Sequence, residues 1–231
     1  MSTGSGQIPL SLSNTVRYTR DSFVEAPCNA AALALVEGKA DWPGGALLLV
    51  GEEGSGKTHL SQVWAHSAGA VVAEADQLTL ADVPKVAAQG RVVIERLDAL
   101  QFCIADVQEA AERALFHLYN LLKQEAGHLL LTSRTAPAQM QIGLPDLASR
   151  LRSIAVAKLG APDDALLEAV LAKLFADRQA KPHPTLIPYL LPRMERSLSS
   201  AGAMVDALDE ASLARKKPLT PALARDVFDW S

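Results

Sequence analysis

The residues best suited to chemistry lie in one short segment, Gly51–Thr58, which reads GEEGSGKT. It fits the pattern G-x-x-x-x-G-K-[ST], which is typical of a loop that binds nucleotide phosphates. Glycines allow backbone N–H groups to surround a phosphate, and the N-terminus of a following helix adds its aligned dipoles. In such a loop the ammonium group of Lys57 reaches the β- and γ-phosphates, and the hydroxyl of Thr58 binds Mg²⁺. The predicted phosphate-binding residues are Gly51, Gly54, Ser55, Gly56, Lys57 and Thr58.

The flanking sequence has the elements that this chemistry needs. The apolar run Ala46–Val50 predicts a buried strand directly before the loop. Apolar residues at helical spacing follow it, and Gly69 is the expected end of that helix. The alternative, a glycine-rich turn with a chance lysine, would not require both flanking elements.

Polar residues at the ends of two other predicted strands could complete the site. Glu95 ends the run Arg91–Glu95 and could help to hold Mg²⁺, although a solvated strand-end carboxylate is the alternative. Arg96 follows it, and a guanidinium cannot act as a general base. Thr132 ends the run His128–Thr132 and could contact the γ-phosphate or the attacking water, although polar residues end most strands.

The alternation of short apolar runs with helical patterns predicts an α/β fold with a doubly wound parallel sheet. From Ala161 the sequence indicates helices alone, which predicts a small all-helical lid domain. We expect a flexible N-terminus at 1–17, an α/β nucleotide-binding domain at 18–159 and the lid at 160–231. The expected helices are Ala30–Glu37, Lys57–Gly69, Ala81–Ala88, Val107–Glu125 ended by Gly127, Asp146–Arg152, one that begins at Pro162, Leu186–Leu191, Glu195–Ala214 and Pro221–Phe228; the further strands are Ala70–Ala73 and Ile154–Lys158.

Composition limits the classes of function. The 231 residues carry a net charge of −4, which argues against a dominant nucleic-acid surface. Two cysteines without metal-ligand spacing favour a reducing, cytoplasmic location, and neither a signal peptide nor a membrane-spanning run is recognisable. The five histidines have no metal-ligand spacing either, so all of them are interpreted as structural.

Three features remain open on the residues alone. The apolar island Gln7–Leu12 is either a first strand tucked onto the domain or a docking peptide, and the burial of apolar residues favours the strand. Arg150 could be a finger that reaches a partner's nucleotide, but a surface salt bridge is the simpler interpretation. Arg193 and Arg196 could contact phosphate from the lid or form a solvated basic face.

Several segments together resemble a known family. From residue 7 to its end the chain resembles the AAA+ domain of the bacterial replication initiator DnaA, and more closely the shortened, Hda-like homologues of that domain. The resemblance rests on the order and spacing of these segments: Gln7–Leu12, Tyr18–Val24 with Asn29, Phe116–Asn120, Leu144–Leu151 and Arg196–Ala201.

The resemblance implies a role for each segment. Phe23, Val24 and Asn29 would cradle the adenine of ADP or ATP. Arg196 would be the arginine that senses nucleotide from the lid, with Arg193 as the second choice. Arg150 would be the arginine finger that acts in trans, Glu95 the acidic Walker B residue that holds Mg²⁺, and Thr132 the sensor 1 candidate. The sliding clamp of DNA polymerase would be bound by Gln7, Ile8, Leu10 and Leu12.

The function implied by the resemblance is negative regulation of replication initiation. A clamp-bound, nucleotide-bound protein would stimulate hydrolysis of the ATP on DnaA, and would meet DNA only through the clamp. A homo-oligomer is possible, and no membrane partner is expected. The sequence departs from the family at Glu95-Arg96, where an acidic pair is usual, so intrinsic hydrolysis should be weak. The alternative is a clamp-loader-like or other DnaA-family ATPase that acts by its own hydrolysis.

Overall fold

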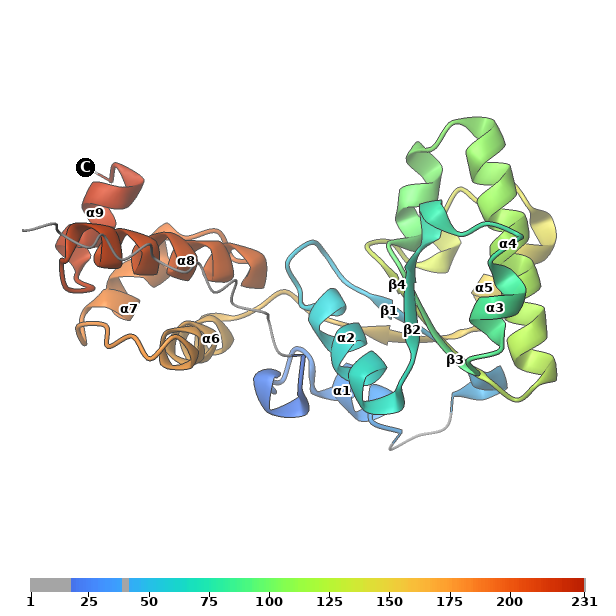
Figure 1. Ribbon diagram of the computed structural model, residues 1–231, viewed down its shortest axis with the longest axis horizontal. Helices are drawn as coiled ribbons and strands as arrows, with labels where there is room; N and C mark the ends of the chain where they lie inside the picture. The colour runs from blue at the N-terminus through green and yellow to red at the C-terminus, as the bar shows by residue number, and fades with distance from the viewer. Residues whose placement is uncertain (1–17, 39–41, 231) are drawn as a thin grey trace, which may run out of the picture.

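The computed structural model describes residues 18–38 and 42–230 of the chain. Figure 1 shows an α/β body, coloured blue to yellow, beside a smaller helical body in orange and red. The hydrophobic clusters of the α/β body contain no residue beyond Leu159 among those described, and the cluster of the helical body begins at Leu167. The predicted boundary at 159/160 falls between them.

A single parallel sheet forms the centre of the α/β body. Its strands are β1 (Ala46–Val50), β2 (Val71–Glu74), β3 (Arg91–Glu95), β4 (His128–Ser133) and β5 (Ala155–Lys158), in the order β2-β3-β4-β1-β5. Every pair of neighbours is parallel. Because β3, β4 and β1 are adjacent, their carboxyl ends meet at one edge of the sheet, which brings together the residues that follow them. The prediction of a parallel α/β sheet is confirmed.

Helices cover both faces of the sheet (Figure 1). Leu47 and Leu49 of β1 pack in one cluster with α1 (Ala30–Val36) and α2 (Lys57–Ala68). Ala46, Leu48 and Val50 pack in the other cluster with α3 (Val83–Ala87), α4 (Ala105–Gln124) and α5 (Pro145–Ser153). Successive side chains of a strand point to opposite faces. A continuous apolar run such as β1 therefore serves both clusters, as in other sheets that are covered on both sides.

The helical body contains α6 (Asp164–Asp177), α7 (Leu186–Leu190), α8 (Leu198–Arg215) and α9 (Pro221–Phe228). Its core is apolar and includes Leu171, Leu208 and Leu223, with Phe175 as its one aromatic residue among the buried residues described. No helix in the described part of the chain is both long and apolar enough to cross a membrane.

Several predicted helix ends differ from the structure by one to three residues, and two of these differences have a clear local cause. The helix expected from Glu195 begins at Leu198, because the Ser197 side chain accepts a hydrogen bond from the N–H of Ser200 and Ser197 itself is extended. The helix expected to end at Glu125, stopped by Gly127, ends at Gln124. There Ala126, with φ 53°, takes the left-handed conformation, and the Gly127 N–H bonds back to the Leu122 carbonyl at 2.7 Å.

Candidate functional site

The loop between β1 and α2 leaves backbone N–H groups available to a ligand. Gly56, the residue before α2, has φ 97°, and Gly54 has φ 71°. Residues that carry a Cβ atom disfavour these conformations. No side chain among the described residues caps the first turn of α2. An uncapped helix start with positive dipole charge is a site for an anion.

Lys57 spans this loop. Its Nζ donates hydrogen bonds to the carbonyl oxygens of Gly51 at 2.7 Å and Glu52 at 2.8 Å. Partial burial lowers the pKa of Lys57, while Asp98 opposes that shift and Arg134 adds to it. The ammonium group is therefore held within the loop by weak neutral acceptors, which a phosphate could replace with stronger charge-assisted bonds.

Ser55 provides a test of whether the loop fits a phosphate. Its side chain is buried, and its Oγ finds no hydrogen-bond partner among the described residues. A buried hydroxyl without a partner is destabilising. An oxygen atom of a bound phosphate would supply the missing acceptor, so the residues present fit that group.

Glu95 is not the solvated carboxylate considered as the alternative. It is 3% exposed, and its oxygens accept hydrogen bonds from Thr58 Oγ1 at 2.9 Å and Ser61 Oγ at 2.6 Å. The Gln62 side-chain amide donates a longer bond at 3.3 Å. The strand-end acid and the loop hydroxyl thus lie in contact, as a shared Mg²⁺ site would require. The sequence analysis missed Ser61. It could have been found from its position one helical turn after Lys57, on the face of α2 that packs against the sheet.

Thr132 and Arg96 meet at the same edge. The Thr132 Oγ1 accepts a hydrogen bond from the Arg96 N–H at 3.0 Å, and Thr132 is buried. Arg96 is left-handed at φ 56°, and its guanidinium pairs with Glu74 at 3.2 Å and Asp76 at 3.4 Å. Burial raises the pKa of Glu74, and the Arg96 charge acts against that rise. Thr132 therefore orders the turn after β3, and the Arg96 side chain is engaged at the end of β2.

A second residue that sequence reasoning missed is Arg134, two positions after Thr132. Its Nη1 pairs with Glu53 of the loop at 2.9 Å. Its backbone N–H donates to Asp98 Oδ1 at 2.8 Å, and its Nε lies 3.8 Å from Asp98 Oδ2. It could have been found from its position in the sequence, since it is a basic residue directly after a strand that ends beside the loop.

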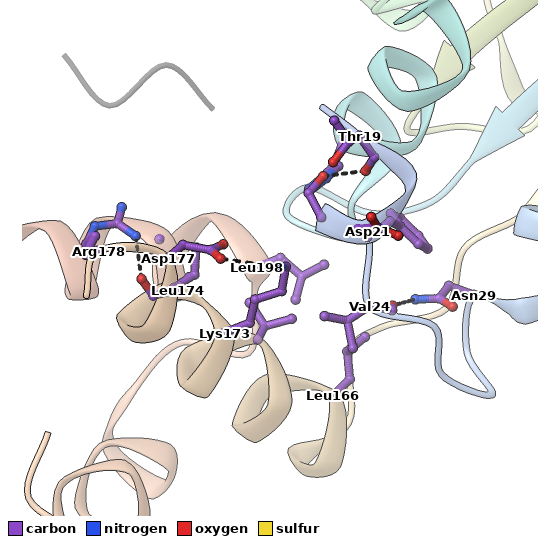
Figure 2. A pocket seen from close by; sticks show the side chains of 15 residues that line it. Thr19, Asp21, Val24, Asn29, Leu166, Lys173, Leu174, Asp177, Arg178 and Leu198 are labelled. Carbon is purple, nitrogen blue, oxygen red and sulfur yellow. Dashed lines mark hydrogen bonds and ion pairs between the residues drawn. The ribbon is translucent and has the colours of Figure 1, made fainter. Parts of the chain in front are cut away.

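A cavity of about 520 Å³ lies between the α/β body and the helical body. Figure 2 shows its two walls: Val24 and Asn29 on one side, and Lys173 and Leu174 of α6 on the other. Leu198 at the start of α8 also lines it. Asn29 holds its own segment in place, because its amide bonds Val24 O and the Ala26 N–H, each at 2.9 Å. The cavity is large enough for a nucleoside and is partly apolar.

His59 is more than the purely structural residue that was predicted, because it also lines this cavity. Its Nε2 lies 2.7 Å from Ser22 Oγ, and its ring makes edge contacts with Tyr18 at 5.5 Å and Phe23 at 5.6 Å. Burial lowers the pKa of His59, and Lys173 lowers it further. The side chain therefore joins α2 to the N-terminal wall of the cavity.

The two lid arginines are not brought to the loop. Arg196 pairs with Asp164 at 2.7 Å, and its side chain is 62% exposed. Arg193 stacks on the Tyr189 ring at 4.0 Å and donates to the Tyr189 carbonyl. The contact between lid and loop is made by backbone instead, where the Leu198 N–H donates to the Gly54 carbonyl at 2.8 Å. A Cβ atom on Gly54 would lie 2.3 Å from Ser197 Cβ, so this approach requires glycine.

Arg150 lies in α5, whose buried side is formed by Leu147 and Leu151. The Arg150 side chain is exposed and forms no ion pair with any residue in the described part of the chain. The surface salt bridge considered for it is thus not formed there. The predicted clamp-binding residues Gln7, Ile8, Leu10 and Leu12 lie outside the described residues.

Comparison with known proteins identifies the architecture. No model of a protein family matches the chain. The structure is similar to domain III of the replication initiator DnaA of Thermotoga maritima, with a TM-score of 0.78 at 20% identity over 92% of this chain and 95% of that one. It is also similar to AMPPCP-bound DnaA of Aquifex aeolicus, with a TM-score of 0.67 at 18% identity over 83% of this chain and 65% of that one.

A further similarity is to the RuvB Holliday junction branch migration motor of Thermotoga maritima, with a TM-score of 0.66 at 13% identity over 92% of this chain and 71% of that one. The chain has the AAA+ fold.

The AAA+ fold explains the position of each group at the candidate site. The sheet places the loop, Glu95 and Thr132 at one edge, because β1, β3 and β4 are neighbours. The lid adds the second wall of the cavity beside that edge. Chemically, the arrangement offers backbone N–H groups, a cation, a hydroxyl and a carboxylate for a phosphorylated ligand, and a partly apolar cavity for the rest of the molecule.

Proposed function

We propose that this protein is a nucleotide-bound regulator of chromosomal replication initiation. In this proposal it binds ADP or ATP with Mg²⁺, docks on the sliding clamp of DNA polymerase, and stimulates hydrolysis of the ATP that is bound to DnaA. It meets DNA only through the clamp, and it can also associate with itself.

The observation that carries the nucleotide part is the geometry of the loop Gly51–Thr58. An uncapped helix start, a buried Ser55 hydroxyl without a partner and the Lys57 ammonium group converge there. The adjacent cavity, lined by Phe23 and Val24, would hold the adenosine part. DnaA structures of the same fold contain the ATP analogue AMPPCP.

Thr58 and Glu95 would hold Mg²⁺, directly or through water. The 2.9 Å contact between them supports this, since a hydroxyl and a carboxylate supply the oxygen atoms that this ion prefers. A bound Mg²⁺ would neutralise charge on the phosphates. Ser61 would keep the Glu95 carboxylate oriented through its 2.6 Å hydrogen bond.

Intrinsic hydrolysis should be weak, because Arg96 stands where the resemblance places an acidic residue. Arg96 cannot take a proton from water, and its side chain is paired with Glu74 and Asp76. The role of Arg150 is instead to reach the nucleotide of DnaA. Its exposure on α5, free of ion pairs within the described residues, leaves it accessible to a partner.

Arg196 would have to leave Asp164 to sense nucleotide from the lid. That pair is exposed, with side-chain exposures of 62% and 69%, so breaking it costs little. Gln7, Ile8, Leu10 and Leu12 would bind the clamp as an extended peptide, with the leucines as apolar anchors.

The test is an ATP-turnover assay in which this protein, DnaA and the clamp loaded on DNA are combined and also omitted one at a time. We expect negligible turnover by this protein alone and stimulated turnover on DnaA when the clamp is present. A trans-acting arginine contributes roughly 10³–10⁵ in rate in well-studied NTPases, so Arg150→Ala should abolish the stimulation. The variant should still bind ADP and the clamp.

The matched control is Arg152→Ala, which removes another exposed arginine from the same helix and should retain the stimulation. A variant with Leu10 and Leu12 both changed to Ala should lose the clamp dependence. Rapid turnover by the wild-type protein alone, unaffected by DnaA, would instead support a clamp-loader-like or other ATPase that acts by its own hydrolysis.

A further inference from the structure

Arg134 lies beside the loop on the side where β4 ends. The end of β4 is joined to the loop by a backbone hydrogen bond, from the Gly51 N–H to the Ser133 carbonyl at 3.3 Å. The Arg134 guanidinium pairs with Glu53, one of the variable positions of the loop, at 2.9 Å. A second cation therefore lies next to the loop that contains Lys57.

The charges around Lys57 place these groups in one electrostatic network. The pKa of Lys57 is lowered first by burial, and Arg134 lowers it further. Asp98, Glu53 and Glu95 act in the opposite direction. Arg134 is thus close enough to affect the pKa of Lys57, and three carboxylates act against it.

The two anchors of Arg134 differ in strength. The pair with Glu53 is exposed, with side-chain exposures of 53% and 72%, and exposed pairs contribute little stability. Asp98 has only 11% of its side chain exposed and accepts the backbone N–H of Arg134 at 2.8 Å. Asp98 therefore fixes the backbone of Arg134 and lies 3.8 Å from its Nε, while its Nη1 can exchange Glu53 for another anion at low cost.

We propose that Arg134 is a specificity-determining residue that distinguishes nucleoside triphosphates from diphosphates by exchanging Glu53 for the terminal phosphate. This inference rests on the proposed binding of a nucleotide in the loop. Glu53 acts as an internal anion that competes with that phosphate for the guanidinium. The diphosphate leaves the Arg134–Glu53 pair intact.

The chemistry of the groups favours this exchange. A guanidinium presents its N–H donors in a planar fork that matches phosphate oxygens, and charge-assisted bonds of this kind are stronger than neutral ones. A terminal phosphate also carries more negative charge than a carboxylate. Arg96 does not contact the loop, because its guanidinium pairs with Glu74 and Asp76 at the end of β2.

The experiment is calorimetric titration with ADP and with AMPPCP, both with Mg²⁺, against the wild type, three variants and one control variant. Arg134→Gln should weaken AMPPCP binding by about tenfold or more, as expected for loss of a charge-assisted contact, and leave ADP binding within about twofold. Glu53→Gln should strengthen AMPPCP binding a few-fold, because the competing anion is removed. Arg134→Lys should recover part of the AMPPCP affinity.

The matched control is Arg113→Gln, which removes an arginine from an exposed ion pair with Glu109 on α4. It should change neither affinity, and thermal melting without nucleotide shows whether each variant is folded. Equal weakening of ADP and AMPPCP by Arg134→Gln, or no effect on either, would overturn the role of Arg134 while the proposed nucleotide site stands. A wild-type protein that binds neither nucleotide would overturn both.

Discussion

Three helices of the lid and the helix after the phosphate-binding loop begin in opposite ways. Before α6, α8 and α9 stand Asp163, Ser197 and Thr220, and each side chain accepts a hydrogen bond from a backbone N–H of the first turn. Before α2 stands Gly56, and no described side chain caps that turn. The same backbone donors are thus satisfied inside the protein in one region and left available in the other.

The difference bears on two separate properties, the stability of a helix and its ability to bind an anion. A side-chain cap stabilises a helix by satisfying N–H groups that would otherwise lack a partner. A cap at α2 would occupy the donors that an anion needs. The caps therefore stabilise α6, α8 and α9 at their N-termini. The N-terminus of α2 stays open to an anion, and its buried Leu60, Val63 and Trp64 stabilise that helix instead.

The largest effect is expected at the loop itself, from Lys57→Ala. Loss of a charge-assisted contact to the phosphates should weaken ADP binding by about 1.5–3 kcal/mol. The increase in melting temperature on addition of ADP should shrink in parallel. Calorimetry and thermal melting measure the two quantities, and an ADP affinity equal to that of the wild type would refute the assignment of the loop.

An intermediate effect, on stability alone, is expected from removal of a lid cap by Thr220→Ala. Loss of the bond from the Leu223 N–H to Thr220 Oγ1 should lower the free energy of unfolding by about 1 kcal/mol. ADP affinity should not change, because α9 is absent from the walls of the cavity within the described residues. Urea denaturation and calorimetry would test this pair of expectations. A loss of ADP binding would show that the two regions are not separable in this way.

The smallest expected effect is on the pH dependence of stability, and it comes from His59. Its pKa is lowered from 6.5 in the folded protein, mainly by burial, so the unfolded chain binds this proton more readily. Stability should therefore fall as the pH drops below about 6.5, down to the lowered pKa of the folded state, and should be unaffected by this group above that range. His59→Gln should reduce the dependence of unfolding free energy on pH between 7 and 5.

The control for this prediction is His183→Gln, in the exposed loop before α7 of the lid. It should leave the pH dependence close to that of the wild type. If His59→Gln and His183→Gln flatten the curve equally, burial of His59 is not the cause.

Local patterns predicted most of the secondary structure. The runs Ala46–Val50 and Arg91–Glu95 are strands with the predicted bounds, and Gly69 ends α2 in the left-handed conformation, with φ 66°. These features depend on neighbours in the chain: continuous apolar residues for a strand buried on both faces, and a glycine where the backbone turns. The wrong start predicted for α8 has a local cause as well, since Ser197 is a better cap than the residues before it.

The partners of the site residues could not be predicted in this way. Thr58 and Glu95 are 37 positions apart, and Ser61 and Glu95 are 34 apart, yet each pair is joined by a hydrogen bond. Arg134 and Glu53 likewise meet only because the end of β4 lies beside the loop after β1. The ion pair of Arg196 with Asp164 also joins distant positions, 32 apart.

The sequence by itself determined the strands, most of the helices and the phosphate-binding loop, because each is encoded by residues that are close in the chain. Only the tertiary structure decided which side chains share an environment. The strand order β2-β3-β4-β1-β5 buries Glu95 against Thr58 and brings Arg134 to Glu53, and the packing of the lid makes His59 a wall of the cavity. Charge and burial depend on these distant contacts, which no local pattern encodes.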